Sequence, residues 1–195
     1  MPLAKRNDFR VYSFDTNDCM TYGLCYNSEP YYKDIQLPPE TDHYDVFFCG
    51  SDKKRMTQLY ALFLFLNELD ITTKIVIFNE EENIKGFEYR KNWMSYDEYL
   101  LNISNCEILI DINQNGQAGY SMRVMESVFF NRKLITSNPY LLEADFYNDS
   151  NIFYVDDFDS IDKVRFMEFY KKDVITYSSE IREKYDIKEW VRRFI

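Results

Sequence analysis

The sequence predicts an α/β fold with a single parallel sheet, and two observations lead to that prediction. From Asp45 onward, short apolar runs alternate with segments in which apolar residues recur at helical spacing. The runs are almost continuously apolar, which is typical of strands covered by helices on both faces. Right-handed crossovers between such strands produce a doubly wound, Rossmann-like sheet.

Five apolar runs are the expected buried strands of this sheet. They cover residues 45–50, 74–78, 107–112, 133–136 and 151–155. Their lengths are those of ordinary strands in globular proteins. A weaker strand is expected at residues 88–90, after an acidic stretch at 79–83 that we interpret as a solvated loop.

Helices are expected between these strands. The first follows Gly50, and its apolar stripe consists of Met56, Leu59, Tyr60, Phe63 and Leu66. The second should run from Ser95 to about Ile103, because Ser95 followed three residues later by Glu98 is a capping-box pattern. A third should begin near Ala118 or Gly119, and its expected inward-facing side chains are Met122, Met125, Val128 and Phe129.

The two ends of the chain differ from this alternating part. Residues 178–195 are highly charged and are expected to form a helix. Residues 1–44 are aromatic, contain Pro30, Pro38 and Pro39, and hold one candidate strand at 10–14. We therefore expect an N-terminal linker segment, residues 1–44, packed on a main domain formed by residues 45–195.

Composition limits the classes of function. The chain has 195 residues, with 23 Lys+Arg against 33 Asp+Glu, a formal net charge of −10. This length fits one domain, and a hydrophobic content of 46% is enough for a core. So acidic a chain is not suited to general nucleic-acid binding, which needs cations that neutralise phosphates.

Cysteine spacing and hydropathy bear on the compartment. The four cysteines contain no Cys-x-x-Cys pair and His43 is the only histidine, so no zinc site is expected. The first residues lack the apolar core of a secretory signal. The longest apolar stretch, residues 60–66, is too short to cross a bilayer. We expect a reduced, cytoplasmic protein.

The turn after the first strand has features of an anion site. Gly50 permits close approach of the backbone to a ligand, and the following helix begins with free N–H groups. Lys53 and Arg55 are cations of the kinds that bind phosphate oxygens. A pyrophosphate would fit here, although the turn is not a Walker A loop. The alternative is a solvated first helical turn.

A second polar turn, residues 113–119, follows the strand at 107–112. A helix beginning here would direct its N–H groups at the same crevice, and Ser121 and Arg123 could contact phosphate or sugar oxygens. Glu126 lies further along this helix, where a carboxylate can accept the two hydroxyls of a ribose. A lone glutamate in a helix is more commonly a surface charge. Its place in a strand–turn–helix unit favours the binding role.

Several stretches resemble one protein family. The sequences CEILIDI at 106–112, QAGYSMRVMES at 117–127 and NRKLITSN at 131–138 are similar to the donor-binding half of bacterial glycosyltransferases of the GT-B type. The similarity is strongest to those of lipopolysaccharide and capsular polysaccharide biosynthesis. Further similarity lies in VYSFD at 11–15, YDVFFCG at 44–50 and DFYN at 145–148.

The resemblance implies that the chain binds a nucleotide-sugar donor, with no further cofactor and no metal. Combined with the two turns, it implies a donor site made of Gly50, Lys53, Arg55, Gln117, Gly119, Ser121, Arg123 and Glu126. Glu126 would hold the ribose, and the turns at Gly50 and Gly119 would lie near the pyrophosphate. The implied partner is a glycan or lipid-linked acceptor, and no nucleic acid is implied.

Two departures from the family pattern leave an alternative open. GT-B enzymes have two Rossmann-like domains with the active site between them, whereas this chain resembles only the C-terminal one. The second glutamate of the family's helix motif would fall near residues 133–134, where the sequence has Lys and Leu. A second chain would then supply the acceptor domain. Alternatively, the chain is a non-catalytic binding or scaffold module in a polysaccharide assembly complex.

Two charged motifs have competing interpretations. Asp157-Phe158-Asp159 resembles the metal-binding Asp-x-Asp of the other major glycosyltransferase fold and would fit a metal-dependent phosphate enzyme. An acidic approach to a helix explains it without a metal. Near the C-terminus, Lys184, Lys188, Arg192 and Arg193 would suit peripheral contact with the inner membrane face. Interspersed acidic residues favour a salt-bridged helix instead.

Overall fold

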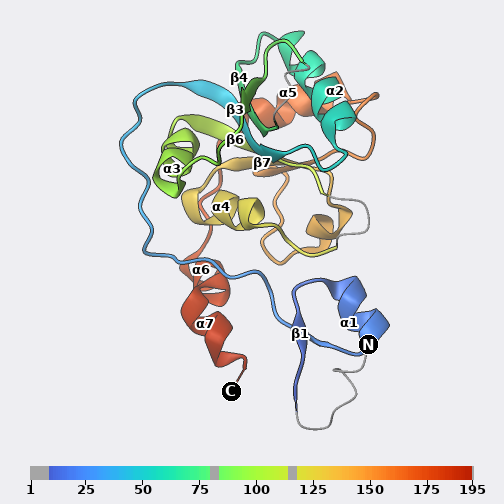
Figure 1. Ribbon diagram of the computed structural model, residues 1–195, viewed down its shortest axis with the longest axis vertical. Helices are drawn as coiled ribbons and strands as arrows, with labels where there is room; N and C mark the ends of the chain where they lie inside the picture. Colours follow the sequence, from blue (N-terminus) through green and yellow to red (C-terminus); the bar gives the residue numbers. More distant parts are fainter. Residues whose placement is uncertain (1–8, 80–83, 114–117, 195) are drawn as a thin grey trace.

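The structure is a computed structural model, and it describes residues 9–79, 84–113 and 118–194 (Figure 1). Its main feature is a six-stranded sheet with the order β5-β4-β3-β6-β7-β8, in which every neighbouring pair is parallel. The strands are β3 (Tyr44–Ser51), β4 (Thr73–Phe78), β5 (Glu88–Arg90), β6 (Cys106–Asp111), β7 (Lys133–Thr136) and β8 (Ile152–Tyr154). The predicted α/β class with a single parallel, Rossmann-like sheet is confirmed.

The strand order defines where a ligand site should lie. From β3 the chain builds outward through β4 to β5, then returns to the other side of β3 and builds outward again through β6, β7 and β8. Connections on the two sides of this reversal leave the sheet in opposite directions. A crevice therefore opens beyond the carboxyl ends of β3 and β6, the position at which doubly wound sheets bind their ligands.

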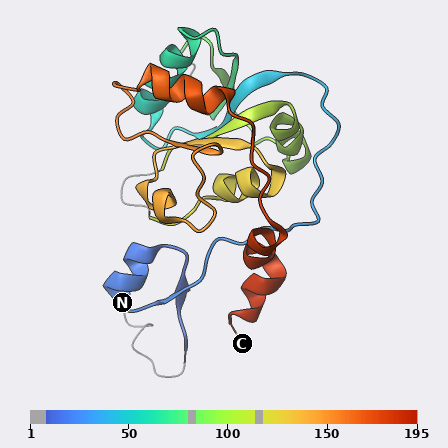
Figure 2. The same cartoon turned by 180° about the vertical axis from the view of Figure 1, so that it is seen from behind.

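Helices cover both faces of the sheet (Figures 1 and 2). α3 (Tyr96–Ser104) and α4 (Met122–Phe130) lie on one face, and α2 (Met56–Asn67) and α5 (Lys163–Lys171) lie on the other. The alternation of side chains along β3 divides the core accordingly. Phe47 packs with α3 and α4, while Phe48 packs with α2 and α5.

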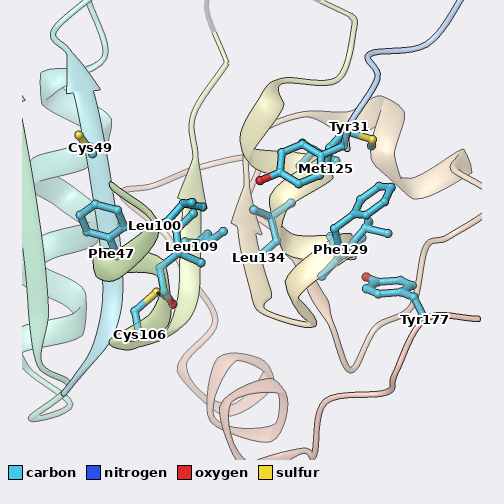
Figure 3. Packing of buried hydrophobic residues seen from close by; sticks show 14 of the residues in the cluster. Tyr31, Phe47, Cys49, Leu100, Cys106, Leu109, Met125, Phe129, Leu134 and Tyr177 are labelled. Atoms are coloured by element: carbon cyan, nitrogen blue, oxygen red, sulfur yellow. Dashed lines mark hydrogen bonds between the residues drawn. The ribbon is translucent and has the colours of Figure 1, made fainter. Parts of the chain in front are cut away.

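The core under α4 also includes side chains from outside the sheet (Figure 3). Leu109 of β6 and Leu134 of β7 are fully buried beneath the helix. Tyr31 packs its ring on Phe129 of α4, with ring centroids 5.0 Å apart. Tyr31 belongs to the N-terminal linker segment, so this segment contributes to the main core.

The N-terminal linker segment forms a small unit of its own before it reaches β3. β1 (Tyr12–Ser13) and β2 (Cys25–Tyr26) pair in parallel, and α1 (Thr16–Tyr22) connects them. At the other end of the chain, a 3₁₀ helix (Pro139–Glu143) precedes β8, and α6 (Ser179–Tyr185) and α7 (Ile187–Arg192) follow α5.

Both chain ends lie at the same end of the molecule and contact each other (Figures 1 and 2). The backbone N–H of Tyr31 donates to Tyr185 O at 2.9 Å, and Ile187 N–H donates to Tyr31 O at 2.7 Å. The indole N–H of Trp190 donates to Ser28 O at 2.6 Å. The linker segment is therefore held by the C-terminal helices as well as by α4.

Two local expectations need correction, and a third is confirmed. α4 begins at Met122, with Ser121 as its N-cap, rather than near Ala118, and Met122 points outward and is exposed. The charged tail forms two helices rather than one, because Asp186 ends α6 in an extended conformation and its side chain caps α7. Ser95 caps α3 through the N–H of Glu98, as the capping-box pattern predicts.

Candidate functional site

A polar cavity of about 300 Å³ lies at the point where the strand order reverses. The carboxyl ends of β3 and β6, the turn before α2 and the first turn of α4 form its wall. Its lining residues are Gly50, Ser51, Lys53, Arg55, Trp93, Asp111, Ile112, Asn113, Ser121 and Arg123. Five of the eight residues predicted from the sequence line it: Gly50, Lys53, Arg55, Ser121 and Arg123.

The turn between β3 and α2 has an unusual backbone. Arg55 N–H donates to Asp52 O at 3.0 Å, and the two central residues, Lys53 and Lys54, have φ angles of 46° and 63°. Positive φ at both central positions is the geometry of a type I′ turn, which normally uses Gly, Asn or Asp. Each lysine is therefore held at a cost of the order of 1 kcal/mol. Backbone strain of this kind clusters at functional sites.

Arg55 connects the two strands that border the cavity. Its Nε and Nη2 donate to Ser51 O at 3.2 and 3.0 Å, and its Nη1 donates to Ile112 O at 2.9 Å. Gly50 makes room for this side chain, because a Cβ at position 50 would lie 2.6 Å from Arg55 Nη2. The sequence predicts that Gly50 makes room for a ligand. In the structure Gly50 makes room for the guanidinium group of Arg55, which faces the cavity.

Arg123 enters the cavity from α4. Its Nη2 donates to Cys49 O at 2.6 Å, and its Nη1 lies 3.7 Å from Asp111 Oδ1. Asp111 is 2% exposed and also accepts a hydrogen bond from Ser121 Oγ at 2.7 Å. The buried carboxylate therefore orients both the guanidinium group and the hydroxyl that line this wall.

The charges of the cavity favour an anion. The guanidinium carbons of Arg55 and Arg123 lie 4.8 and 4.9 Å from the centroid of the same Phe48 ring. Burial, with a smaller contribution from the charge of Arg123, lowers the pKa of Arg55 to about 10. An anion bound between the two groups would relieve their repulsion. Each guanidinium has more N–H donors than its protein bonds use, so donors remain for a ligand.

Gly119 does not contribute to this cavity, contrary to the sequence prediction. The N–H groups of Ala118 and Gly119 donate to Asp15 Oδ2 at 2.8 and 3.3 Å, so an internal carboxylate occupies the donors expected to bind pyrophosphate. A Cβ at position 119 would lie 2.3 Å from the ring of Phe14 and 2.8 Å from its carbonyl oxygen. The absence of a side chain at Gly119 serves packing against the linker segment.

Glu126 is also placed away from the cavity. It is 1% exposed and accepts a hydrogen bond from Tyr99 OH at 2.6 Å, between α3 and α4. Burial raises the pKa of Glu126 to about 7. Gly50, Gly119 and Glu126 therefore do not share one hollow, and in this arrangement the carboxylate of Glu126 is not accessible to a ribose. Gln117, the remaining predicted residue, lies outside the described residues.

Sequence reasoning missed three residues that shape this region. Asp111 could have been found, because it ends an apolar strand at the edge where parallel strands present their ligands. Trp93 lines the cavity but follows the weakest strand, where the apolar pattern gave little guidance. No local signal connects Asp15 with the turn at Ala118.

The remaining charged candidates have structural roles. Asp157 Oδ1 accepts the N–H of Asp159 within the loop before α5, and the described part of the chain holds no cluster of three or more potential metal-binding side chains. Among the C-terminal cations, Lys184 pairs with Asp145 and Arg192 with Glu189. Over the same described ranges, no helix has the length and apolar character needed to span a bilayer.

A larger cavity of about 780 Å³ lies between β1 and α7, and apolar side chains dominate its lining. Phe14, Trp190 and Phe194 are among them. Arg10 is its one lining side chain with a positive charge among the described residues, so it lacks the converging cations of the smaller cavity. The cavity at the strand reversal is therefore the better candidate for an anionic ligand.

Comparison with known proteins adds no assignment: no protein-family model matches the sequence, and a search of curated proteins finds no match.

Proposed function

We propose that the chain is a glycosyltransferase-like protein that binds a nucleotide-sugar donor for the synthesis of a bacterial surface polysaccharide, such as lipopolysaccharide, capsule or exopolysaccharide. The observation that carries the proposal is the convergence of Arg55 and Arg123 in a cavity at the strand reversal of a parallel sheet. The sequence resemblance to the GT-B donor-binding half supports the choice of ligand.

The diphosphate of the donor would lie between the two guanidinium groups. Arginine binds phosphate oxygens with two parallel hydrogen bonds, and Lys53 at the rim would add a point charge. Ser51 and Ser121 supply hydroxyl groups at the same wall. Relative to the sequence prediction, the proposed site keeps the β3–α2 turn and the start of α4, and it gains Asp111 as the group that orients Arg123.

In this proposal the cations also serve the reaction. When the bond between the anomeric carbon and the diphosphate oxygen breaks, negative charge develops on the leaving diphosphate. Fixed guanidinium groups stabilise such charge without reorganisation, which lowers the barrier. The acceptor, a glycan or a lipid-linked sugar, would approach from a second chain that completes the active site, in the cytoplasm or at the inner membrane face.

Calorimetric titration with a panel of nucleoside diphosphates tests the proposal. We expect Arg123→Gln to weaken binding about 10- to 100-fold, since it removes charged hydrogen bonds. Lys53→Gln should weaken binding several-fold, whereas Lys54→Gln should leave it unchanged, because Lys54 shares the strained turn but does not line the cavity. Absence of binding by the intact chain, or equal binding by all three variants, would overturn the proposal.

One observation favours the alternative function, a non-catalytic binding or scaffold module. Asp15 already occupies the N–H groups of Ala118 and Gly119, which leaves fewer backbone donors for a diphosphate. Donor hydrolysis and sugar transfer, measured with and without candidate partner chains, separate the two functions. Turnover of donor by the chain alone would eliminate the scaffold function.

A further inference from the structure

Trp93 is an exposed aromatic residue at the edge of the cationic cavity. It lines the cavity together with Arg55 and Arg123, yet 73% of its surface is accessible to solvent. Tryptophan is highly buried on average, whereas this indole presents most of its surface to solvent beside a polar cavity. The inference drawn from it rests on the proposed donor-binding function and concerns a different part of the ligand.

The position of the indole ring is defined by Phe78 at the end of β4. The two ring centroids are 4.5 Å apart, with an angle of 44° between the rings. This contact supports one side of the indole and leaves most of its surface open. The ring is thus a supported platform, which reduces the entropy lost when a ligand stacks on it.

The platform lies beside the cations in a defined register. Phe78 is the Cα partner of Ser51 in the β3–β4 pair, and Ser51 lines the cavity and binds Arg55. Adjacent strands are about 4.8 Å apart. Phe78, which supports the indole, is therefore one strand away from the cationic wall, and Trp93 itself lines the cavity.

This juxtaposition matches a ligand that joins an anionic group to a flat ring. We propose that Trp93 stacks on the base of the nucleoside diphosphate while Arg55 and Arg123 hold the diphosphate. Stacking of a base on an aromatic side chain tolerates every base, because each base has a π face. Trp93 would thus select a nucleotide over a bare phosphate without choosing strictly among bases.

Titrations with uridine diphosphate, adenosine diphosphate and inorganic pyrophosphate test this role. Trp93→Ala should weaken the binding of both nucleotides about 5- to 150-fold, the range that corresponds to loss of a stacked base, and Trp93→Phe should retain part of that affinity. Pyrophosphate should bind both variants as it binds the parent chain. Because Trp93 is exposed, neither variant should lose the fold, which circular dichroism would verify.

Fluorescence gives a second, independent reading. The chain has two tryptophans, and Trp190 packs against the linker segment far along the sequence from this cavity. In a Trp190→Phe background, Trp93 is the only tryptophan, so excitation that is selective for tryptophan reports on Trp93 alone. We expect its emission to be quenched by a nucleoside diphosphate and unchanged by pyrophosphate.

The outcomes separate the two proposals. Nucleotide binding that is equal in the parent and in Trp93→Ala would overturn the stacking role and leave the diphosphate site intact. A further titration uses a sugar 1-phosphate, which has no base. If Trp93→Ala weakens the binding of the sugar 1-phosphate but not of the nucleotides, the stacking role is also overturned, because the indole would then face the sugar. If neither nucleotides nor pyrophosphate bind the parent chain, the proposed function fails as well.

Discussion

The carboxylate of Asp15 accepts a hydrogen bond from the backbone N–H of Ala118 at 2.8 Å, across 103 positions of the sequence. The same oxygen accepts the N–H of Gly119, and the second oxygen accepts the N–H groups of Asn17 and Asp18 at the start of α1. One buried side chain therefore caps a helix of the linker segment and satisfies the turn after β6. This contact joins the linker segment to the main sheet.

Replacing Asp15 by Asn should destabilise the chain. An amide presents only one acceptor oxygen, so either the α1 N-terminus or the turn at Ala118 would face an N–H₂ donor. We expect a loss of about 1–3 kcal/mol in the free energy of unfolding, measured with urea at neutral pH. Asp18→Asn is the matched control, because Asp18 is exposed in the same helical turn. Equal stability of the two variants would contradict the role of Asp15.

The difference in unfolding free energy between the parent chain and Asp15→Asn should depend on pH. Burial works against the charge of Asp15, but its backbone hydrogen bonds outweigh it and lower the pKa of Asp15 below 3.8. A carboxyl group whose pKa is lower in the folded state stabilises the fold above the unfolded-state pKa and loses that contribution as the pH falls. The stability gap between the parent chain and Asp15→Asn should therefore narrow below about pH 4.

Replacement by alanine should have different effects at Gly50, which lines the cavity, and at Gly119, which does not. At position 119 the new Cβ meets the ring and the backbone oxygen of Phe14, so the linker segment must shift, and a loss of roughly 1–3 kcal/mol in stability is expected. At position 50 the new Cβ would lie too close only to the end of the Arg55 side chain, while its 3.4 Å separation from the Phe48 ring is an ordinary contact. Gly50→Ala should keep the fold but weaken diphosphate binding, as thermal unfolding and calorimetry on both variants would show. If Gly119→Ala weakened diphosphate binding without loss of stability, or Gly50→Ala lost stability without an effect on binding, these roles of the two glycines would be wrong.

The features that the sequence predicted correctly depend on local pattern alone. The strands around 45–50, 107–112 and 133–136 were recognisable because a strand buried on both faces is apolar along its whole length. Gly50, Arg55 and Arg123 were found because a parallel sheet presents its carboxyl ends at one edge, so local position implied the site. Neither inference requires knowledge of which distant segments touch.

The contacts that corrected the prediction depend on distant segments. The position of Glu126 in the apolar pattern of α4 fits either the exposed or the buried face of the helix. In the structure Tyr99 of α3 packs over Glu126 and donates a hydrogen bond to its carboxylate. The N–H donors of Ala118 and Gly119 are satisfied by Asp15, and four of the six strands, β3 to β6, lie between Asp15 and Ala118 in the sequence. Helical periodicity describes one element at a time, so it carries no information on either partner.

Lys133 should be important for stability although it lies far from the cavity. It is 4% exposed, and its Nζ donates to the carbonyl oxygens of Phe169, Tyr170 and Lys172 at the end of α5. Lys133→Met keeps the apolar stem but leaves these acceptors unsatisfied, so we expect a loss of about 2–4 kcal/mol in urea unfolding. Lys171→Met, at an exposed position of the same helix, should be nearly neutral. A neutral Lys133→Met would refute the capping role.

The contribution of Glu126 to folding stability should depend on pH in the opposite direction to that of Asp15. Burial raises its pKa from 4.5 to about 7, so between these values the folded state binds more protons than the unfolded state. Stability from this group is then fully present below pH 4.5 and is lost as the pH rises through 7, a change of about 3 kcal/mol at most.

Glu126→Gln keeps an oxygen for the hydroxyl of Tyr99 and cannot ionise. Its stability should therefore vary less than that of the parent between pH 5 and 8, and it should exceed the parent at pH 8. Urea unfolding of both proteins across this range measures the difference. Glu143→Gln, at an exposed carboxylate, should reproduce the profile of the parent. Parallel profiles for the parent and Glu126→Gln would show that the carboxyl group does not titrate in this range in the folded chain.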